Sequence, residues 1–273
     1  MYDESDYSHQ PKILLFDIET TPFVAYSWGP KYQVNLIDFI HDWHVLCFAY
    51  KWLGEDDVKI VSQRQFPSYH KHKNNRRKAE ETRRDDKSVV KEMWRLFDEA
   101  DIIIAHNGDK FDIKKMNARF AIHGLGRPTP FHTVDTVKVA RRSFSFGSNS
   151  LNDLGKFLSL GQKLTHTGFE LWVGCMAGLD EDWQLMEDYN KQDVVLLEQV
   201  YKRFLMEGWI DNHPSLSLIS GQSHGCPNCL SVDRQKRGFH NTKAYRFQRY
   251  QCNNCKSYYR GRSAQEGSRS AFR

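Results

Sequence analysis

Two short apolar runs restrict the fold of this chain more than any other feature. KILLF (residues 12–16) and DIIIA (residues 101–105) contain few polar side chains, the pattern of strands buried on both faces of a sheet. Such strands need helices on either side, and the chain has helical patterns at residues 88–100, 114–126 and 148–161. The alternation of strands and helices predicts an α/β domain.

Three further segments extend this expectation. HVLCFAYKWL (44–53) and VKIVS (58–62) flank the turn GEDD, so they predict an antiparallel hairpin and make the sheet mixed. FHTVDTVKVAR (131–141) has the pattern of a strand running into a helix. Residues 179–209 carry the longest helical pattern, and we expect two consecutive helices there.

Charge is unevenly distributed along the 273 residues. From Cys226 onward there are 11 Lys/Arg and 2 Asp/Glu, against 28 and 32 before it. A near-neutral or acidic body with a basic end favours a polyanionic partner, above all nucleic acid, although a basic end can also be inert.

The segment 64–87 is also basic, with nine Lys/Arg and four Asp/Glu. A solvated loop, a polar helix start and a nucleic-acid-contacting arm all fit it. No apolar stretch approaches the ~20 residues of a membrane span, and the polar start MYDESDYSHQ lacks the signal-peptide pattern. We therefore expect a cytoplasmic protein without a membrane partner.

Four acids and a tyrosine occupy positions suited to metal chemistry. Asp17 and Glu19 follow a buried strand at i and i+2, so both carboxylates face one side of the sheet. Such a pair repels itself unless it is solvated or holds a cation. Asp112 stands at a strand-to-helix junction, with Asp109 in the turn as a competitor.

The helical segment EDYNKQDVVLLEQV adds the remaining two residues. Tyr189 and Asp193 are i and i+4, on one helix face. An uncompensated carboxylate at the start of an apolar run would be costly. A packed tyrosine and a capping aspartate are the alternative interpretation.

Together, FDIET (16–20), HNGDKFD (106–112) and YNKQD (189–193) resemble the three ordered motifs of the DEDD exonucleases, the RNase H-like 3′–5′ exonucleases that include polymerase proofreading domains. The resemblance covers residues 12–206 and implies an RNase H-like mixed sheet flanked by helices. One branch of the family carries His five residues before the last acid, where this chain has Asp188. Tyr189 stands where the other, tyrosine-type branch (DEDDy) has its tyrosine.

The resemblance implies a site with two Mg²⁺ or Mn²⁺ ions held by Asp17, Glu19, Asp112 and Asp193. Carboxylate oxygens suit these hard ions. Asp17 would bridge both ions, Glu19 and Asp193 would complete the ion that activates water, and Asp112 would hold the second. Tyr189, with an ordinary pKa of ~10, would orient the water. We expect two further substrate contacts, from Asn107 to the terminal nucleotide and from Phe23 beside its base.

The other chemical signal is cysteine spacing. CPNC (226–229) and CNNC (252–255) enclose 22 residues, which predicts a closed, structural Cys₄ zinc site of Cys226, Cys229, Cys252 and Cys255. A reducing compartment makes disulfides between these cysteines the weaker interpretation. A redox CxxC is also disfavoured, because it would leave the second matching pair unexplained. Cys47 and Cys175 lie in apolar segments and are expected to be buried thiols.

The segment between the cysteine pairs alternates large and basic residues and resembles the zinc ribbons of transposases and other nucleic-acid-binding proteins. It predicts a two-stranded ribbon with Arg246 and Arg249 among its substrate contacts. A ribbon that only contacts protein or packs on the core is the alternative.

We therefore expect an exonuclease domain (residues 1–210), a linker (211–225), a zinc ribbon (226–260) and a disordered tail (261–273). The expected activity is metal-dependent 3′–5′ hydrolysis of DNA, with single-stranded 3′ ends preferred. The alternatives are an RNA exonuclease, a structure-specific endonuclease and a catalytically silent adaptor. A separate polymerase or repair protein is a possible partner, by analogy with compact bacterial and phage exonucleases.

Overall fold

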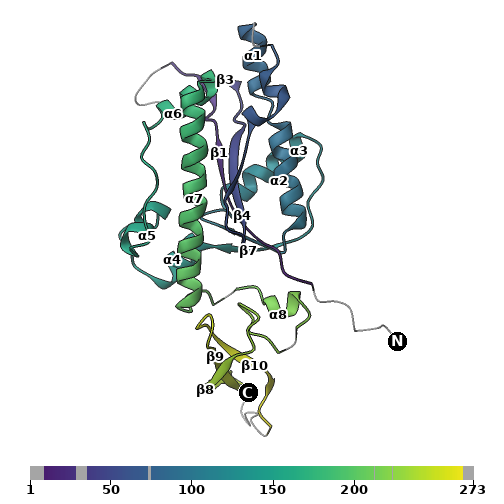
Figure 1. The fold of residues 1–273 in the computed structure, drawn as a ribbon, viewed down its shortest axis with the longest axis vertical. Helices are drawn as coiled ribbons and strands as arrows, with labels where there is room; N and C mark the ends of the chain where they lie inside the picture. The colour runs from purple at the N-terminus through teal and green to yellow at the C-terminus, as the bar shows by residue number, and fades with distance from the viewer. Residues whose placement is uncertain (1–8, 29–35, 73–74, 212, 223, 267–273) are drawn as a thin grey trace, which may run out of the picture.

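Five strands form the central sheet of the protein (Figure 1). The structure is a computed structural model, and it describes residues 9–28, 36–72, 75–211, 213–222 and 224–266. The strand order is β5 (Lys59–Ser62), β4 (Val45–Trp52), β1 (Ile13–Thr20), β6 (Ile102–Ala105) and β7 (His132–Asp135). β1 is antiparallel to β4 and parallel to β6, and β4 pairs antiparallel with β5. The predicted mixed sheet with its hairpin is confirmed.

Helices cover both faces of this sheet, because β1 is apolar on both. Leu14, Phe16 and Ile18 pack toward α2 (Lys87–Glu99) and α3 (Asp112–Ile122). Ile13 and Leu15 share a core with α4 (Thr136–Ser143), α5 (Leu151–Phe157) and α7 (Asp180–Met206). Figure 1 shows α7 on one side of the sheet and α2 and α3 on the other. The odd-numbered positions of β1 therefore face α7.

Helix α7 is one continuous helix of 27 residues, so the prediction of two consecutive helices was wrong. Residues 180–206 contain neither glycine nor proline, and nothing else in them interrupts the backbone hydrogen bonds. The break lies earlier, at Gly178 (φ +82°), which ends α6 (Glu170–Ala177) in the left-handed conformation that glycine favours. One rigid helix thus spans the sheet for about 40 Å.

Two smaller units flank one end of the sheet. β2 (Val24–Tyr26) and β3 (Asp38–His41) form a separate hairpin. The basic segment 64–87 contains the turns η1 (Gln63–Gln65) and η2 (Pro67–His70) and the helix α1 (Arg76–Arg83). Part of this segment is therefore a polar helix, and residues 73–74 lie outside the described residues.

The C-terminal region differs from the prediction in three ways. The ribbon has three antiparallel strands, β8 (Arg234–Asn241), β9 (Arg246–Cys252) and β10 (Tyr258–Ala264), because the chain returns alongside β9 after the second cysteine pair. The predicted linker contains α8 (Leu216–Ile219), whose Leu216 is buried in the same core as α7. Gly261–Ala264, predicted as part of a disordered tail, belong to β10, and residues 267–273 lie outside the described residues.

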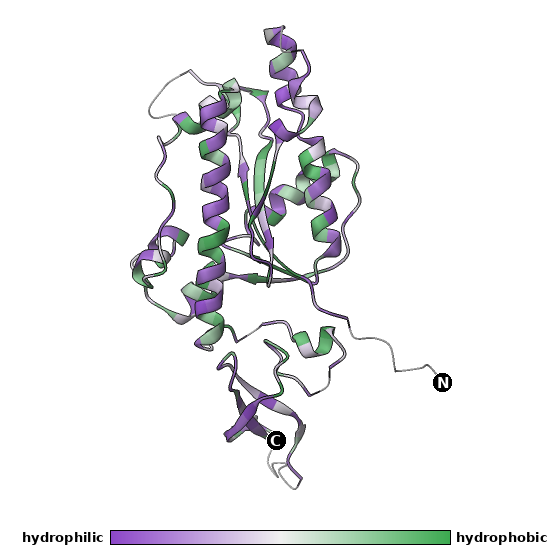
Figure 2. Ribbon diagram, in the orientation of Figure 1, coloured by the Kyte–Doolittle hydropathy of each residue, from purple (hydrophilic) through white to green (hydrophobic). Residues whose placement is uncertain are grey.

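Hydropathy separates the two regions clearly. In Figure 2 the strands of the ribbon are largely hydrophilic, whereas strands of the central sheet are hydrophobic. Among the residues that the structure describes, no helix has the length and apolarity that crossing a membrane requires.

Candidate functional site

The first two acids lie on the face of β1 that meets α7. Asp17 and Glu19 continue the odd-numbered row of Ile13 and Leu15, so their carboxylates point where the apolar side chains point. Asp17 pairs with Ala49 and Glu19 with Cys47 on the neighbouring strand β4. Pairing with β4 at these positions, and with β6 at Ile13–Leu15, holds the strand and fixes the direction of both carboxylates.

Helix α7 supplies the facing side chains. Asp193 is 1% exposed and Tyr189 7% exposed, and both contact the ammonium group of Lys163, as expected for residues on one helix face. Oxygens of Asp17, Glu19 and Asp193 all lie within 4.8 Å of one another. We call these three residues the acid cluster. The structure thus brings together three of the four acids predicted from sequence.

The fourth acid, Asp112, is the first residue of α3 and is 4% exposed. It is not a member of the group defined by the 4.8 Å limit, although its charge acts on both Asp17 and Glu19. Backbone N–H groups of Ile18 and of Asp112 itself stabilise its carboxylate. Asp109, the competitor for this position, pairs with Lys138.

Two residues of the site were not predicted from the sequence. Lys163 donates to Asp193 Oδ2 (2.6 Å) and to the Tyr189 hydroxyl (3.0 Å). Asn190 is fully buried and donates through Nδ2 to Asp17 Oδ2 (2.7 Å). Asn190 lies inside the motif YNKQD, and that position could have identified it. Lys163 lies in the loop after α5 without any local motif, so only the three-dimensional structure reveals it.

Burial and mutual repulsion dominate the electrostatics of the acids. Burial raises the pKa of Glu19 to about 8, and the charge of Asp193 adds to the effect. The pKa of Asp17 is raised well above its ordinary value by burial and then by Asp112, Asp193 and Glu19. Burial raises the pKa of Asp112 to about 6 and also raises that of Asp193, with Lys163 opposing the latter. Each of these acids would be more easily ionised beside a cation.

The donor set fits divalent cations. It consists of carboxylate oxygens without thiolates, as Mg²⁺ and Mn²⁺ prefer. Asp193 Oδ1 is buried and has no hydrogen-bond partner among the described residues, so one ligand oxygen is available at the centre of the cluster. Burial raises the pKa of Tyr189 to about 12, which keeps its hydroxyl protonated as a hydrogen-bond donor.

The two predicted substrate contacts lie on loops at this end of the sheet. Asn107 adopts a left-handed conformation (φ 68°), and its backbone N–H donates to Asp135 Oδ1. Phe23 is 53% exposed, and its ring contacts Phe39 of β3 (centroids 5.5 Å apart). Both positions are accessible to a ligand, and their contacts with substrate stay predictions.

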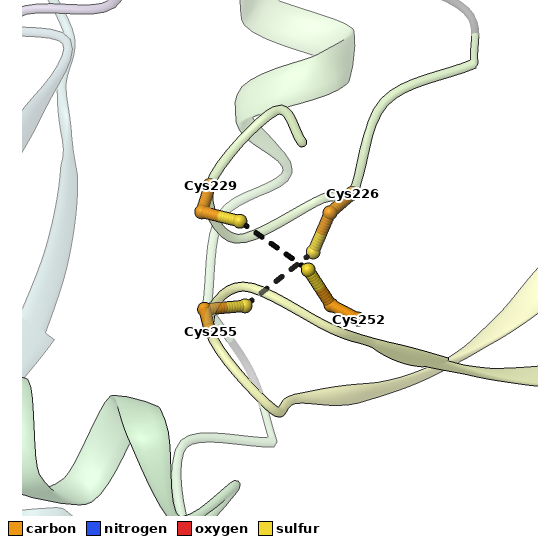
Figure 3. A group of neighbouring side chains, drawn as sticks. All are labelled: Cys226, Cys229, Cys252 and Cys255. Atoms are coloured by element: carbon orange, nitrogen blue, oxygen red, sulfur yellow. Dashed lines mark hydrogen bonds between the residues drawn. The ribbon is translucent and has the colours of Figure 1, made fainter. Parts of the chain in front are cut away.

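The four predicted cysteine ligands meet at one point. Cys226 Sγ lies 3.6 Å from Cys255 Sγ, and Cys229 Sγ lies 3.6 Å from Cys252 Sγ (Figure 3). We call these four residues the cysteine cluster. A tetrahedron with Zn–S bonds of ~2.3 Å has edges of about 3.8 Å, whereas a disulfide has its sulfurs ~2.05 Å apart. The geometry is compatible with a closed zinc site and excludes disulfides between these pairs.

The remaining cysteines and the predicted ribbon arginines have other surroundings. Cys47 and Cys175 are 0% and 1% exposed free thiols, as predicted. Arg246 lies over the ring of Phe239 (3.6 Å to the centroid). Arg249 donates to the Arg237 carbonyl (2.8 Å). The roles of both arginines in substrate binding stay predictions.

Comparisons with known proteins agree with this architecture. The family model RNase_H_2, described as RNase_H superfamily, matches residues 14–205. A family B DNA polymerase from the hyperthermophilic archaeon Pyrobaculum calidifontis has a similar fold, with a TM-score of 0.50 and 15% identity. The match covers 86% of this chain but 31% of the polymerase chain, so this protein spans under a third of its length. No curated protein matches the sequence.

Proposed function

Because the chain belongs to the RNase H superfamily, we propose that it is a metal-dependent 3′–5′ exonuclease of the tyrosine type. Its substrate would be DNA, with single-stranded 3′ ends preferred. The observation that carries the proposal is the acid cluster, in which the partly buried Asp17 and Glu19 of β1 and the buried Asp193 of α7 bring carboxylate oxygens within 4.8 Å of one another. Carboxylates repel one another in such a site unless cations join them.

We propose that Asp17, Glu19, Asp112 and Asp193 hold two Mg²⁺ or Mn²⁺ ions. Such a pair, when bound, activates water and neutralises charge on the phosphate and on the leaving 3′ oxygen. Asp17 lies centrally in β1 and would bridge the two positions. Glu19 and Asp193 would share one of them, and Asp112, at the start of α3, would serve the other.

The protein's own groups would position the reactants. Asn190 holds the Asp17 carboxylate through its side-chain amide, which fixes the orientation of the bridging ligand. Tyr189 would donate a hydrogen bond to the attacking water, because a phenol with an ordinary pKa of ~10 is a poor base at neutral pH. Lys163 lies where substrate phosphates would approach and would move away from Asp193 when ions bind.

A degradation panel tests this proposal. Single-stranded DNA, duplex DNA and RNA, each labelled at the 5′ or the 3′ end, are incubated with Mg²⁺ or Mn²⁺. A 3′–5′ exonuclease shortens the 5′-labelled strand stepwise and releases the 3′ label at once as a mononucleotide. First products of internal length would indicate an endonuclease, and preferential loss of RNA would replace the DNA assignment.

Asp193→Asn supplies the control for this panel. It keeps the size of the side chain but removes its charge, and we expect activity to fall at least about a thousandfold, or ~4 kcal/mol of transition-state stabilisation. Wild-type activity in Asp193→Asn would show that the acid cluster is not the active site. Unchanged wild-type activity after divalent ions are removed with a chelator would contradict the metal-dependent mechanism.

A further inference from the structure

A groove of about 500 Å³ lies between α8 and the sheet of the ribbon. One wall is formed by Ser215, Ser217 and Leu218 with the loop around His224, and the other by residues of β8, β9 and β10. We call it the ribbon groove. No acidic side chain lines it, whereas three arginines do: Arg234, Arg260 and Arg262. The Arg260 side chain alternates with Tyr259 along β10 and lies over the Phe247 ring on the other face of the ribbon (4.4 Å).

The ribbon groove combines positive charge with flat aromatic surface. Tyr250 and Tyr259 stack across β9 and β10, with centroids 5.7 Å apart and rings inclined by 30°. The Arg234 guanidinium lies over the Tyr250 ring, 4.4 Å from its centroid. Gly261 also lines the groove, and its missing side chain leaves the edge of Tyr250 accessible, since a Cβ there would lie 3.4 Å from Tyr250 Cε2.

The charge of the groove is not neutralised within the protein. None of the three arginines forms an ion pair with a carboxylate in the described part of the chain; Arg262 reaches only the Ser217 hydroxyl (3.4 Å), and Arg234 reaches the His224 carbonyl (3.4 Å). Arginines beside stacked aromatic rings are the combination that binds single-stranded nucleic acid, through phosphates and through base stacking.

The ribbon groove is also fixed relative to the acid cluster. The Ser257 hydroxyl donates to the Leu205 carbonyl near the end of α7 (3.1 Å), and Leu216 N–H donates to the Pro227 carbonyl (2.6 Å). Leu230 packs against the core that contains α7. Leu205 stands twelve residues beyond Asp193 on one straight helix, which separates them by about 18 Å.

We propose that the ribbon groove holds a single-stranded segment of the substrate at least five nucleotides from the bond being hydrolysed. The spacing follows from about 18 Å divided by the ~3.4 Å between phosphates along one stacked strand. This inference rests on the proposed function, and it predicts that strands shorter than about five nucleotides do not gain affinity from the groove.

The test measures binding without hydrolysis, in full-length zinc-loaded protein carrying Asp193→Asn. Fluorescence anisotropy follows labelled single-stranded DNA of three and of twelve nucleotides across a salt titration. Adding Arg234→Gln and Arg262→Gln should weaken binding of the twelve-nucleotide strand about tenfold. The slope of log affinity against log salt should fall by about 1.4, because two phosphate contacts are lost at ~0.7 each. Binding of the three-nucleotide strand should not change.

A matched control removes the same charge from the ribbon outside the groove. Arg237 and Lys243 are exposed and do not line the groove, and Arg237→Gln with Lys243→Gln should change affinity less than twofold. Equal effects of the two double variants, or an unaffected groove variant with normal zinc content, would overturn the proposal. So would groove-dependent binding of a labelled glutamate-rich peptide in preference to the DNA, which would indicate a protein partner.

Failure of this inference can be told from failure of the proposed function. If wild-type protein degrades DNA but the groove variant binds normally, the groove assignment is wrong and the exonuclease stands. If no nucleic acid is degraded and yet the groove variant loses affinity for the long strand, the exonuclease proposal is wrong and the groove is a nucleic-acid-binding site.

Discussion

The acid cluster and the cysteine cluster are both groups of side chains suited to cations, but they are supported differently. Asp17 and Asp193 lie on elements whose apolar neighbours, such as Leu15 and Leu197, are 0–1% exposed. In the ribbon, the buried hydrophobic group consists of the cysteines themselves, with Tyr259 packed against them, and every residue of β8 is exposed. The nuclease domain therefore holds its acids on an apolar core that is complete without them, whereas we expect the ribbon to need a metal ion in order to fold.

The difference extends to what each site can do. Carboxylates on β1 and α7 repel one another without a cation, so the domain bears an electrostatic cost at a site it holds rigidly. Functional sites commonly keep such unfavourable interactions, so a substitution that removes one can stabilise the folded protein while it abolishes function. Four thiolates around one ion would leave no position for substrate, so we expect any contribution of the ribbon to function to come from its surface.

The largest effect is expected from Asp17→Asn. Hydrolysis should fall at least about a thousandfold, because the bridging ligand loses its charge. In metal-free protein the same change should raise the melting temperature, since it removes a buried carboxylate that three other acids repel. Calorimetry in chelator and a nuclease assay in Mg²⁺ measure both effects. Loss of activity together with a lower melting temperature would mean that Asp17 supports the fold, contrary to the comparison.

The cysteine cluster should behave in the opposite way. Cys252→Ser should release zinc and unfold the ribbon, while β1 and α7 keep their hydrogen-exchange protection and short strands are still cut within a few fold of wild type. All seven tryptophans precede Cys226, so tryptophan fluorescence reports the nuclease domain alone. Cys175→Ala, another buried cysteine outside the cluster, is the matched control and should retain zinc. Global unfolding of Cys252→Ser would show that the two regions fold as one unit.

A smaller effect is expected from Lys163→Met. The Lys163 ammonium lies 2.6 Å from Asp193 Oδ2 and neutralises part of the acid cluster in the absence of ions. Removing it should lower the concentration of Mn²⁺ needed for half-saturation about tenfold, since a competing positive charge is lost. Isothermal titration calorimetry measures this directly. Weaker Mn²⁺ binding in the variant would indicate that Lys163 supports the metal-bound arrangement instead.

The sequence predicted what depends on local pattern. The runs around Leu15 and Ile103 predicted the buried strands, and the ordered motifs predicted that Asp17, Glu19 and Asp193 come together, as they do. Contacts between segments far apart in the sequence could not be predicted from local pattern. Lys163 reaches Asp193 from a loop without a motif, and helical patterns do not show where one helix ends and the next begins, so α7 was divided wrongly.

The same limit applies in the C-terminal region. Cysteine spacing predicted which four thiols meet, because chemistry restricts their number and separation. It did not predict the third strand, whose residues Tyr258–Ala264 are partly exposed and carry little apolar signal. The packing of Leu216 against the nuclease core was hidden for a different reason, since Ser and Pro around it are typical of a linker.

The smallest effect expected is a change in how the free energy of unfolding depends on pH, and it comes from the buried His106. His106 lies in the turn between β6 and α3, where its ring nitrogens contact Thr136 Oγ1 (2.8 Å) and the Asn149 carbonyl (2.9 Å). Burial lowers its pKa to about 4, below the ordinary ~6.5 of an unfolded chain. Between these values the unfolded state binds more protons than the folded state, so the stabilising contribution is present above pH 6.5 and is lost as pH falls toward 4.

His106→Gln should therefore flatten the decline of unfolding free energy below pH 6.5 by about 1 kcal/mol per pH unit, within the ~1.4 that one proton allows. Denaturant unfolding followed by tryptophan fluorescence at pH 4.5–7.5 measures this slope. All tryptophans lie in the nuclease domain, so the signal does not report zinc loss from the ribbon. His132→Gln, an exposed substitution on β7, is the control. If His106→Gln leaves the pH slope as steep as in wild type, the acid sensitivity of this domain arises from another residue. His44 is then the next position to test, because burial lowers its pKa to about 4 as well.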